Sequence, residues 1–100
     1  MPYFIAAKLE AFSDRGKGDF YGSHDMEDII TVLDGSKSAE QEIFDSPDLV
    51  RKYISVKLNK YLSDPFFSES IEGHLEGPTR GQRARLLEQI IIRIAGGRGA

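Results

Sequence analysis

The sequence predicts an all-α protein, a compact bundle of five or six helices. Apolar residues recur every three to four positions in several separate segments, as on the buried face of a helix. Strand-like alternation is confined to residues 3–6, and the connections between the periodic segments are short. We expect one helical domain over residues 1–95 and a flexible, glycine-rich tail over residues 96–100.

The composition is that of an ordinary globular domain, with 40% apolar and 29% charged residues. A net charge of −3 argues against broad nucleic-acid binding by the whole surface. The absence of cysteine excludes a disulfide framework and makes a cytoplasmic location the expectation. The sequence shows no signal peptide, and no apolar run approaches the ~20 residues of a membrane span.

The first two helices form a hairpin around a glycine-rich loop. Pro2 suits the first turn of a helix, and apolar positions follow at helical spacing until Gly16 ends it. Residues 16–22 contain three glycines and are expected to be a loop. Ser23 is a good N-cap, and the acids after it suit the positive start of a second helix, which Gly35 ends.

The next two helices are predicted from their start signals. Ser38 and Gln41 have the spacing of a capping box, which indicates a short helix through Phe44. Residues 46–48 supply a serine cap, a first-turn proline and an acid for a longer helix that the Asp64-Pro65 pair ends. Its apolar stripe is expected to consist of Leu49, Val50, Tyr53, Ile54, Leu58, Tyr61 and Leu62.

The remainder contains a short segment and a last helix. Phe66 and Phe67 begin an aromatic-led segment toward Ile71, and glycines with Pro78 indicate a loop after it. A final helix is expected from about Thr79, with an inward face made of Leu86, Leu87, Ile90, Ile91 and Ile94.

Lys8 is the first candidate functional residue. It lies at the edge of the apolar stripe of the first helix. A lysine there either snorkels, with its stem on apolar surface and its ammonium in water, or presents a point charge to a phosphate. The sequence leaves both interpretations open.

Asp25 and Asp28 are the second candidates. They are three residues apart, so their side chains share one face of the second helix. Two acids on one face repel unless a cation or a lysine lies between them. A purely structural role is complementing the positive start of the helix. A hard cation such as Mg²⁺ would also suit an aspartate pair, together with substrate phosphates.

Histidines and aromatic residues carry weaker signals. His24 and His74 lack the spacing of a zinc site, no metal-ligand set is predicted, and we expect His74 at the surface without a partner. The glycines match neither a dinucleotide fingerprint nor a P-loop. Phe20 and Tyr21 either stack on a base or close the helix pair as a small hydrophobic plug.

The stretch from Lys8 to Asp34 resembles the C-terminal helical half of minimal nucleotidyltransferases of the AbiEii/AbiGii toxin type. The resemblance rests on AAKLEAF around Lys8, on DRGKGD in the turn that follows, and on SHDMEDIITVLDG in the second helix. It covers about the first third of the chain well. Residues 46–53 and 63–66 are similar in style but less specific.

The resemblance implies roles for four residues. Lys8 would help to bind nucleotide phosphate, and Asp25 and Asp28 would complete the catalytic site as its acidic pair. Asp19, on the loop between the helices, is a weaker candidate for nucleotide binding. The implied reaction is transfer of a nucleotidyl group from a nucleoside triphosphate, with Mg²⁺ held by carboxylates and an antitoxin as a partner.

The sequence departs from the family pattern in one respect. The family's main carboxylates lie in a Gly-Ser turn and an Asp-x-Asp motif on a β-sheet before the lysine helix, and this sequence has no such motif. We therefore expect a chain that is inactive alone: a C-terminal fragment, a truncated reading frame, or a partner of a separate N-terminal catalytic half. The alternative is a stand-alone helical protein-interaction module that forms a homodimer through an exposed apolar patch.

Overall fold

The computed structural model describes residues 1–16 and 18–96, and within these ranges all regular secondary structure is helical. The helices are α1 (Pro2–Ala11), a π-helical turn η1 (Phe12–Gly16), α2 (His24–Gly35), α3 (Ala39–Phe44), α4 (Asp48–Leu62), α5 (Pro65–Gly73) and α6 (Arg80–Gly96), joined by short loops. The predicted all-α bundle is confirmed. The first helix ends at Gly16 as expected, but its last turn is a π-helix. Helix α6 reaches Gly96, and the rest of the expected tail, residues 97–100, lies outside the described residues.

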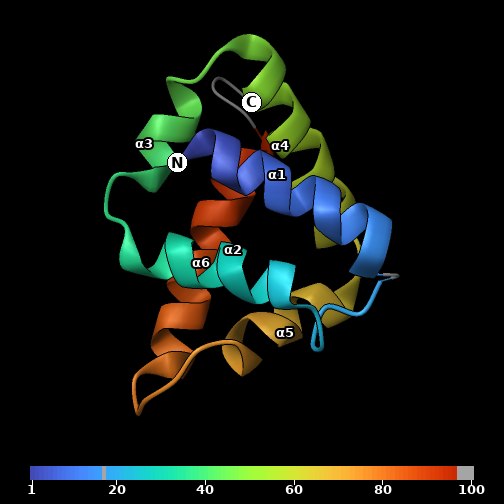
Figure 1. Ribbon diagram of the computed structural model, residues 1–100. Coiled ribbons are helices and arrows are strands. Elements are labelled where there is room, and N and C mark those ends of the chain that lie inside the picture. Colours follow the sequence, from blue (N-terminus) through green and yellow to red (C-terminus); the bar gives the residue numbers. More distant parts are fainter. Residues whose placement is uncertain (17, 97–100) are drawn as a thin grey trace.

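Helix α6 is the central element of the bundle. It packs against α2, α3, α4 and α5. Figure 1 shows α1 and α2 as an antiparallel pair that lies across α6, with α5 near the lower end of the bundle. None of the described helices is long and apolar enough to cross a membrane.

One continuous core holds the helices together. Its largest fully buried side chains come from every helix: Ile5, Leu9, Phe12, Met26, Ile29, Ile30, Ile43, Ile54, Leu58, Phe67, Ile71 and Ile91. Burial of these side chains is the main source of stability, at roughly 25 cal/mol per Å² of apolar surface. Among the described residues, no buried side-chain nitrogen or oxygen lacks a hydrogen-bond partner.

Four rings pack together where η1, the following loop, α4 and α5 meet. Phe12, Phe20, Tyr61 and Phe67 have ring centroids between 5.2 and 6.1 Å apart. The Phe20 ring is buried, which confirms the hydrophobic plug for that residue, whereas Tyr21 is exposed and donates a hydrogen bond to Glu69.

His74 does not match its predicted place. Its Nε2 lies 2.6 Å from the Phe20 carbonyl oxygen and is part-buried. His74 follows the last residue of α5, so it ties the end of that helix to the loop before α2. The expectation of a surface histidine without a partner was wrong because it considered only neighbours along the sequence.

Two predicted caps are also wrong. Ser38 makes no cap, and its hydroxyl instead donates to the Glu42 carboxylate. Ser46 is buried, and its hydroxyl donates to the Ile43 carbonyl, so Pro47 stands at the cap position of α4. In both places the side chain is oriented toward a nearby acceptor rather than toward the backbone N–H groups of the next helix.

Two residues of the predicted inward stripes face solvent. Leu49 is 84% exposed and Leu86 is 60% exposed. Each helix carries more apolar residues than its core-facing side accommodates, so the outermost ones remain in water.

Candidate functional site

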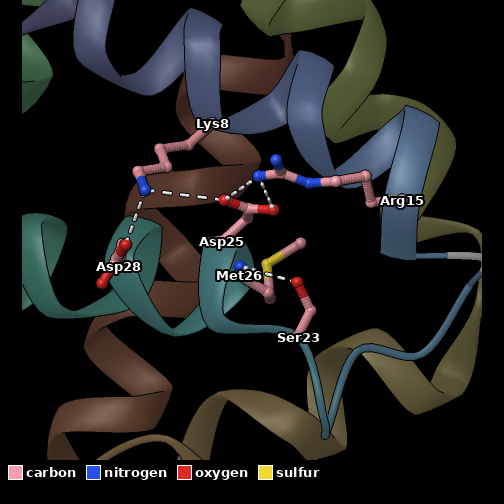
Figure 2. A network of polar contacts seen from close by, with 6 residues as sticks. All are labelled: Lys8, Arg15, Ser23, Asp25, Met26 and Asp28. Carbon is pink, nitrogen blue, oxygen red and sulfur yellow. Dashed lines mark hydrogen bonds and ion pairs between the residues drawn. The ribbon is translucent and has the colours of Figure 1, made fainter.

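The polar cluster lies between the two helices of the N-terminal hairpin. Ser23 takes an extended backbone conformation, and its hydroxyl accepts a hydrogen bond from the Met26 backbone N–H at 3.1 Å. This cap starts α2 at His24 and places the first turn of α2 opposite α1. The predicted N-cap is confirmed, and Figure 2 shows it below the ion-paired side chains.

Lys8 lies between the two aspartates of α2. Its Nζ is 2.8 Å from Asp28 Oδ2 and 3.5 Å from Asp25 Oδ1. The ammonium therefore compensates the repulsion expected of two acids on one helix face. Its side chain is 28% exposed, and the ammonium also lies over the Phe4 ring, 5.6 Å from the centroid. Simple snorkelling does not describe it, because the charge is held by partners from another helix.

Arg15 is a fourth member, although its place at the end of the first helix suggests only a solvated charge that complements the negative end of that helix. Its Nη2 donates to both carboxylate oxygens of Asp25, at 3.1 and 3.0 Å. Figure 2 shows the Arg15 side chain reaching from the end of the first helical segment toward Asp25. Its spacing of seven residues from Lys8, about two helical turns, was the available signal.

Asp25 is the centre of the cluster. Its side chain is only 12% exposed, and it is shared by Lys8 and Arg15. The hydrogen bond from Arg15 is the main cause that lowers the pKa of Asp25, and Lys8 adds to it, while burial opposes the shift. The hydrogen bond with Asp28 is the main cause that raises the pKa of Lys8, against the effect of burial. Both shifts favour the charged forms of Asp25 and Lys8 near neutral pH.

Asp19 lies beside the cluster but is not part of its ion-pair network. Its carboxylate accepts a hydrogen bond from the Gly22 backbone N–H at 2.9 Å and shapes the loop. A Cβ at position 22 would collide with that carboxylate, so the Asp19 side chain would have to move to accept a larger residue there. Asp19 shares a shallow hollow of about 310 Å³ with Arg15 and Asp25, and Lys8 is not among its lining residues. The structure thus brings Lys8, Asp25 and Asp28 together and leaves Asp19 apart.

The arrangement is balanced in charge, with two cations facing two carboxylates. Both oxygens of Asp25 already bind cations, and Asp28 binds Lys8. The described part of the chain contains no group of three histidine, cysteine or acidic side chains placed to hold a metal ion. The aspartate pair as arranged therefore does not fit Mg²⁺, and its chemistry is to hold and orient an ammonium and a guanidinium at the surface.

The fold and the cluster together define a small helical bundle with a surface ion-pair network of two cations and two acids. Comparison with known proteins adds no name to this class: no family model matches the chain, and neither a curated protein nor a solved structure matches it.

Proposed function

We propose that this chain is the helical part of a nucleotidyltransferase-like protein and that Lys8 binds the phosphates of a nucleoside triphosphate. The observation that carries the proposal is the position of Lys8 Nζ, held between Asp25 and Asp28 at a partly exposed point between two helices. A lysine in such a setting has a fixed direction and a maintained charge, which is what recognition of a phosphate by a point charge requires.

Arg15 would be the second cation of the same site. Its side chain is 71% exposed, and only Nη2 contacts Asp25. Its Nε and Nη1 make no hydrogen bond within the described residues and could donate to a second phosphate oxygen. Guanidinium groups bind phosphate with a planar fork of donors. Asp25 would then act as a positioning residue that orients both cations.

The roles of the acids differ from those that the family resemblance implies. Asp28 is the more exposed of the two, and exposed ion pairs contribute little to stability. A phosphate oxygen could therefore replace Asp28 on Lys8 at small cost. Transfer itself, in which an acceptor hydroxyl attacks the α-phosphorus and pyrophosphate leaves, would need carboxylates and Mg²⁺ supplied by a sheet-bearing polypeptide. On this proposal the chain alone binds phosphate weakly and does not catalyse transfer.

Calorimetry of nucleotide binding tests the proposal. The chain is mixed with a polypeptide that carries the Gly-Ser and Asp-x-Asp motifs, and ATP, GTP, CTP and UTP are titrated in turn with Mg²⁺. Lys8→Ala should weaken binding of the preferred nucleotide about tenfold, a loss equivalent to one good charged contact. Lys37→Ala removes an exposed lysine from the α2–α3 connection and serves as the matched control.

The same experiment can contradict the proposal. Equal affinity in the wild type, Lys8→Ala and Lys37→Ala would show that Lys8 does not face the nucleotide. Unchanged binding and transfer in Asp28→Ala, together with that result, would remove the α1–α2 hairpin from the site altogether.

A further inference from the structure

An apolar groove runs between α1 and α4, away from the Lys8 cluster. It measures about 340 Å³ and is lined by Tyr3, Ala6, Ala7, Glu10, Leu49, Val50 and Tyr53. Tyr3 is 64% exposed, and Leu49 is the most exposed large apolar side chain in the described chain. Val56 continues the stripe on α4, since Leu49, Tyr53 and Val56 are spaced four and three residues apart.

Helix α1 carries more apolar surface than one buried side requires. Ile5 and Leu9 are buried in the core, yet Tyr3, Phe4 and Ala7 remain exposed on its outer side. Tyr3 and Ala7 line the groove, so α1 presents apolar surface outside its core-facing side. Contiguous exposed apolar patches with a polar rim mark sites of protein association.

The charges beside the groove differ between its two sides. Glu10 on α1 lines the groove and Asp14 follows in η1. Helix α4 carries Lys52, Lys57 and Lys60, of which Lys57 lies beside the lining residue Tyr53. None of these five makes an ion pair with any described residue, whereas Lys8, Arg15, Arg51, Arg83 and Arg93 all do. Lys57 instead lies over the Tyr53 ring, 5.7 Å from its centroid.

The acidic and the basic residues lie at the same level along the groove. Tyr53 on α4 is close enough to Glu10 and Asp14 for both acids to raise its pKa, although burial is the largest cause. Lys57 contacts that same tyrosine. Glu10 and Asp14 therefore lie on one side of this stretch of the groove, and Lys57 lies on the other side.

We propose that the α1–α4 groove is a homodimer interface and that its occupant is the same groove of a second copy. A two-fold axis along the groove exchanges its two edges. Glu10 and Asp14 of each copy would then face the basic α4 edge of the other copy. The apolar floors of the two grooves would pack together. An isologous interface has to be complementary to itself, and a patch with one acidic and one basic edge meets that requirement.

The dimer would leave the Lys8 cluster accessible. Lys8 lies about 140° around α1 from Tyr3, because five residues turn a helix by that amount. The groove faces α4 and solvent, whereas Lys8 faces α2. Dimerisation and nucleotide binding are thus independent, and either can fail without the other.

Sedimentation equilibrium from micromolar to near-millimolar concentration tests the proposal. The wild type should approach twice the 11.2 kDa mass of the chain. Leu49→Glu should weaken self-association about tenfold or more by placing a charge in the apolar floor. Ile92→Glu, a change of similar size at an exposed position on α6, should not. Circular dichroism checks that each variant keeps its helix content.

Charge reversal gives a second, independent test. Glu10→Lys and Lys57→Glu should each weaken the dimer, because like charges then face each other across the two-fold axis. The double variant should recover most of the lost affinity. A wild type that stays monomeric, as it would if another polypeptide covered the groove, overturns the proposal. Open-ended oligomers, or charge variants without recovery, overturn the two-fold arrangement.

Discussion

At the scale of single residues, Asp25 is the position on which the hairpin site depends. It is nearly buried and is the shared partner of Lys8 and Arg15, whereas Asp28 is 43% exposed and has one partner. We expect Asp25→Asn to lower the free energy of unfolding by about 1–2 kcal/mol, since charged hydrogen bonds from two cations are lost. Asp28→Asn should cost clearly less. Urea denaturation at neutral pH measures both.

The lowered pKa of Asp25 fixes the sign of its pH dependence. A carboxyl group whose pKa is lower in the folded state stabilises the protein at pH values above its pKa in the unfolded state, here 3.8. That contribution is lost as the pH falls through the pKa of the folded state. The stability difference between wild type and Asp25→Asn should therefore shrink below about pH 4. Glu40, whose pKa Arg93 also lowers, is present in both proteins and does not affect the difference. A difference that stays constant down to the acid transition would contradict the ion-pair account.

Residue types and spacing predicted part of this site. Lys8, Asp25 and Asp28 were expected near one another, and the requirement for a cation between the acids anticipated the contact that Lys8 makes. Arg15 was missed because its partner lies ten residues away across a loop, and its contact depends on how the π-helical turn ends α1. Helical spacing puts Arg15 about two turns from Lys8, but it does not show which residue beyond the loop Arg15 contacts.

At the scale of elements, two serines with similar sequence signals behave differently. The Ser23 hydroxyl accepts from the Met26 N–H at the start of α2. Ser38 occupies the N-cap position of α3, but its hydroxyl donates to Glu42 and makes no side-chain cap. Ser23→Ala should lower the free energy of unfolding by about 1 kcal/mol, the usual value of an N-cap. Ser38→Ala should change it by less than about half of that, because an exposed side-chain pair contributes little.

Thermal or urea unfolding measures the change in the free energy of unfolding of each serine variant.

The boundaries of the helices were predicted better than the side-chain hydrogen bonds that cap them. The start signals at Ser23 and Ser38 and the glycine at position 35 place α2 and α3 to within a residue or two, although Ser38 makes no side-chain cap. Which acceptor a serine uses depends on where its neighbours lie, as Ser46 shows by bonding back to the Ile43 carbonyl.

At the scale of the whole molecule, the bundle is organised around α6. The sequence predicted an amphipathic last helix but not its central position, because the order in which helices pack is set by long-range contacts. Leu86 was expected in the core because it belongs to the apolar stripe of α6. It is exposed, since the neighbouring helices cover only one side of α6 at that position. The core positions Leu87, Ile91 and Ile94 were predicted correctly.

The central position of α6 predicts how the protein unfolds. Four other helices pack on α6, so a defect in its buried face should destabilise the molecule as one unit.

Ile91 is fully buried and its neighbour Ile92 is half exposed, which makes them a matched pair. Ile91→Val should lower the free energy of unfolding by about 1 kcal/mol, and Ile92→Val should leave it nearly unchanged. Far-ultraviolet circular dichroism reports the helices. Tyrosine fluorescence in a variant with Tyr3, Tyr21 and Tyr53 changed to Phe reports the ring cluster around Tyr61, since the chain lacks tryptophan. Both signals should shift together in Ile91→Val, and separate transitions would show that the ring cluster and the α6 core unfold independently.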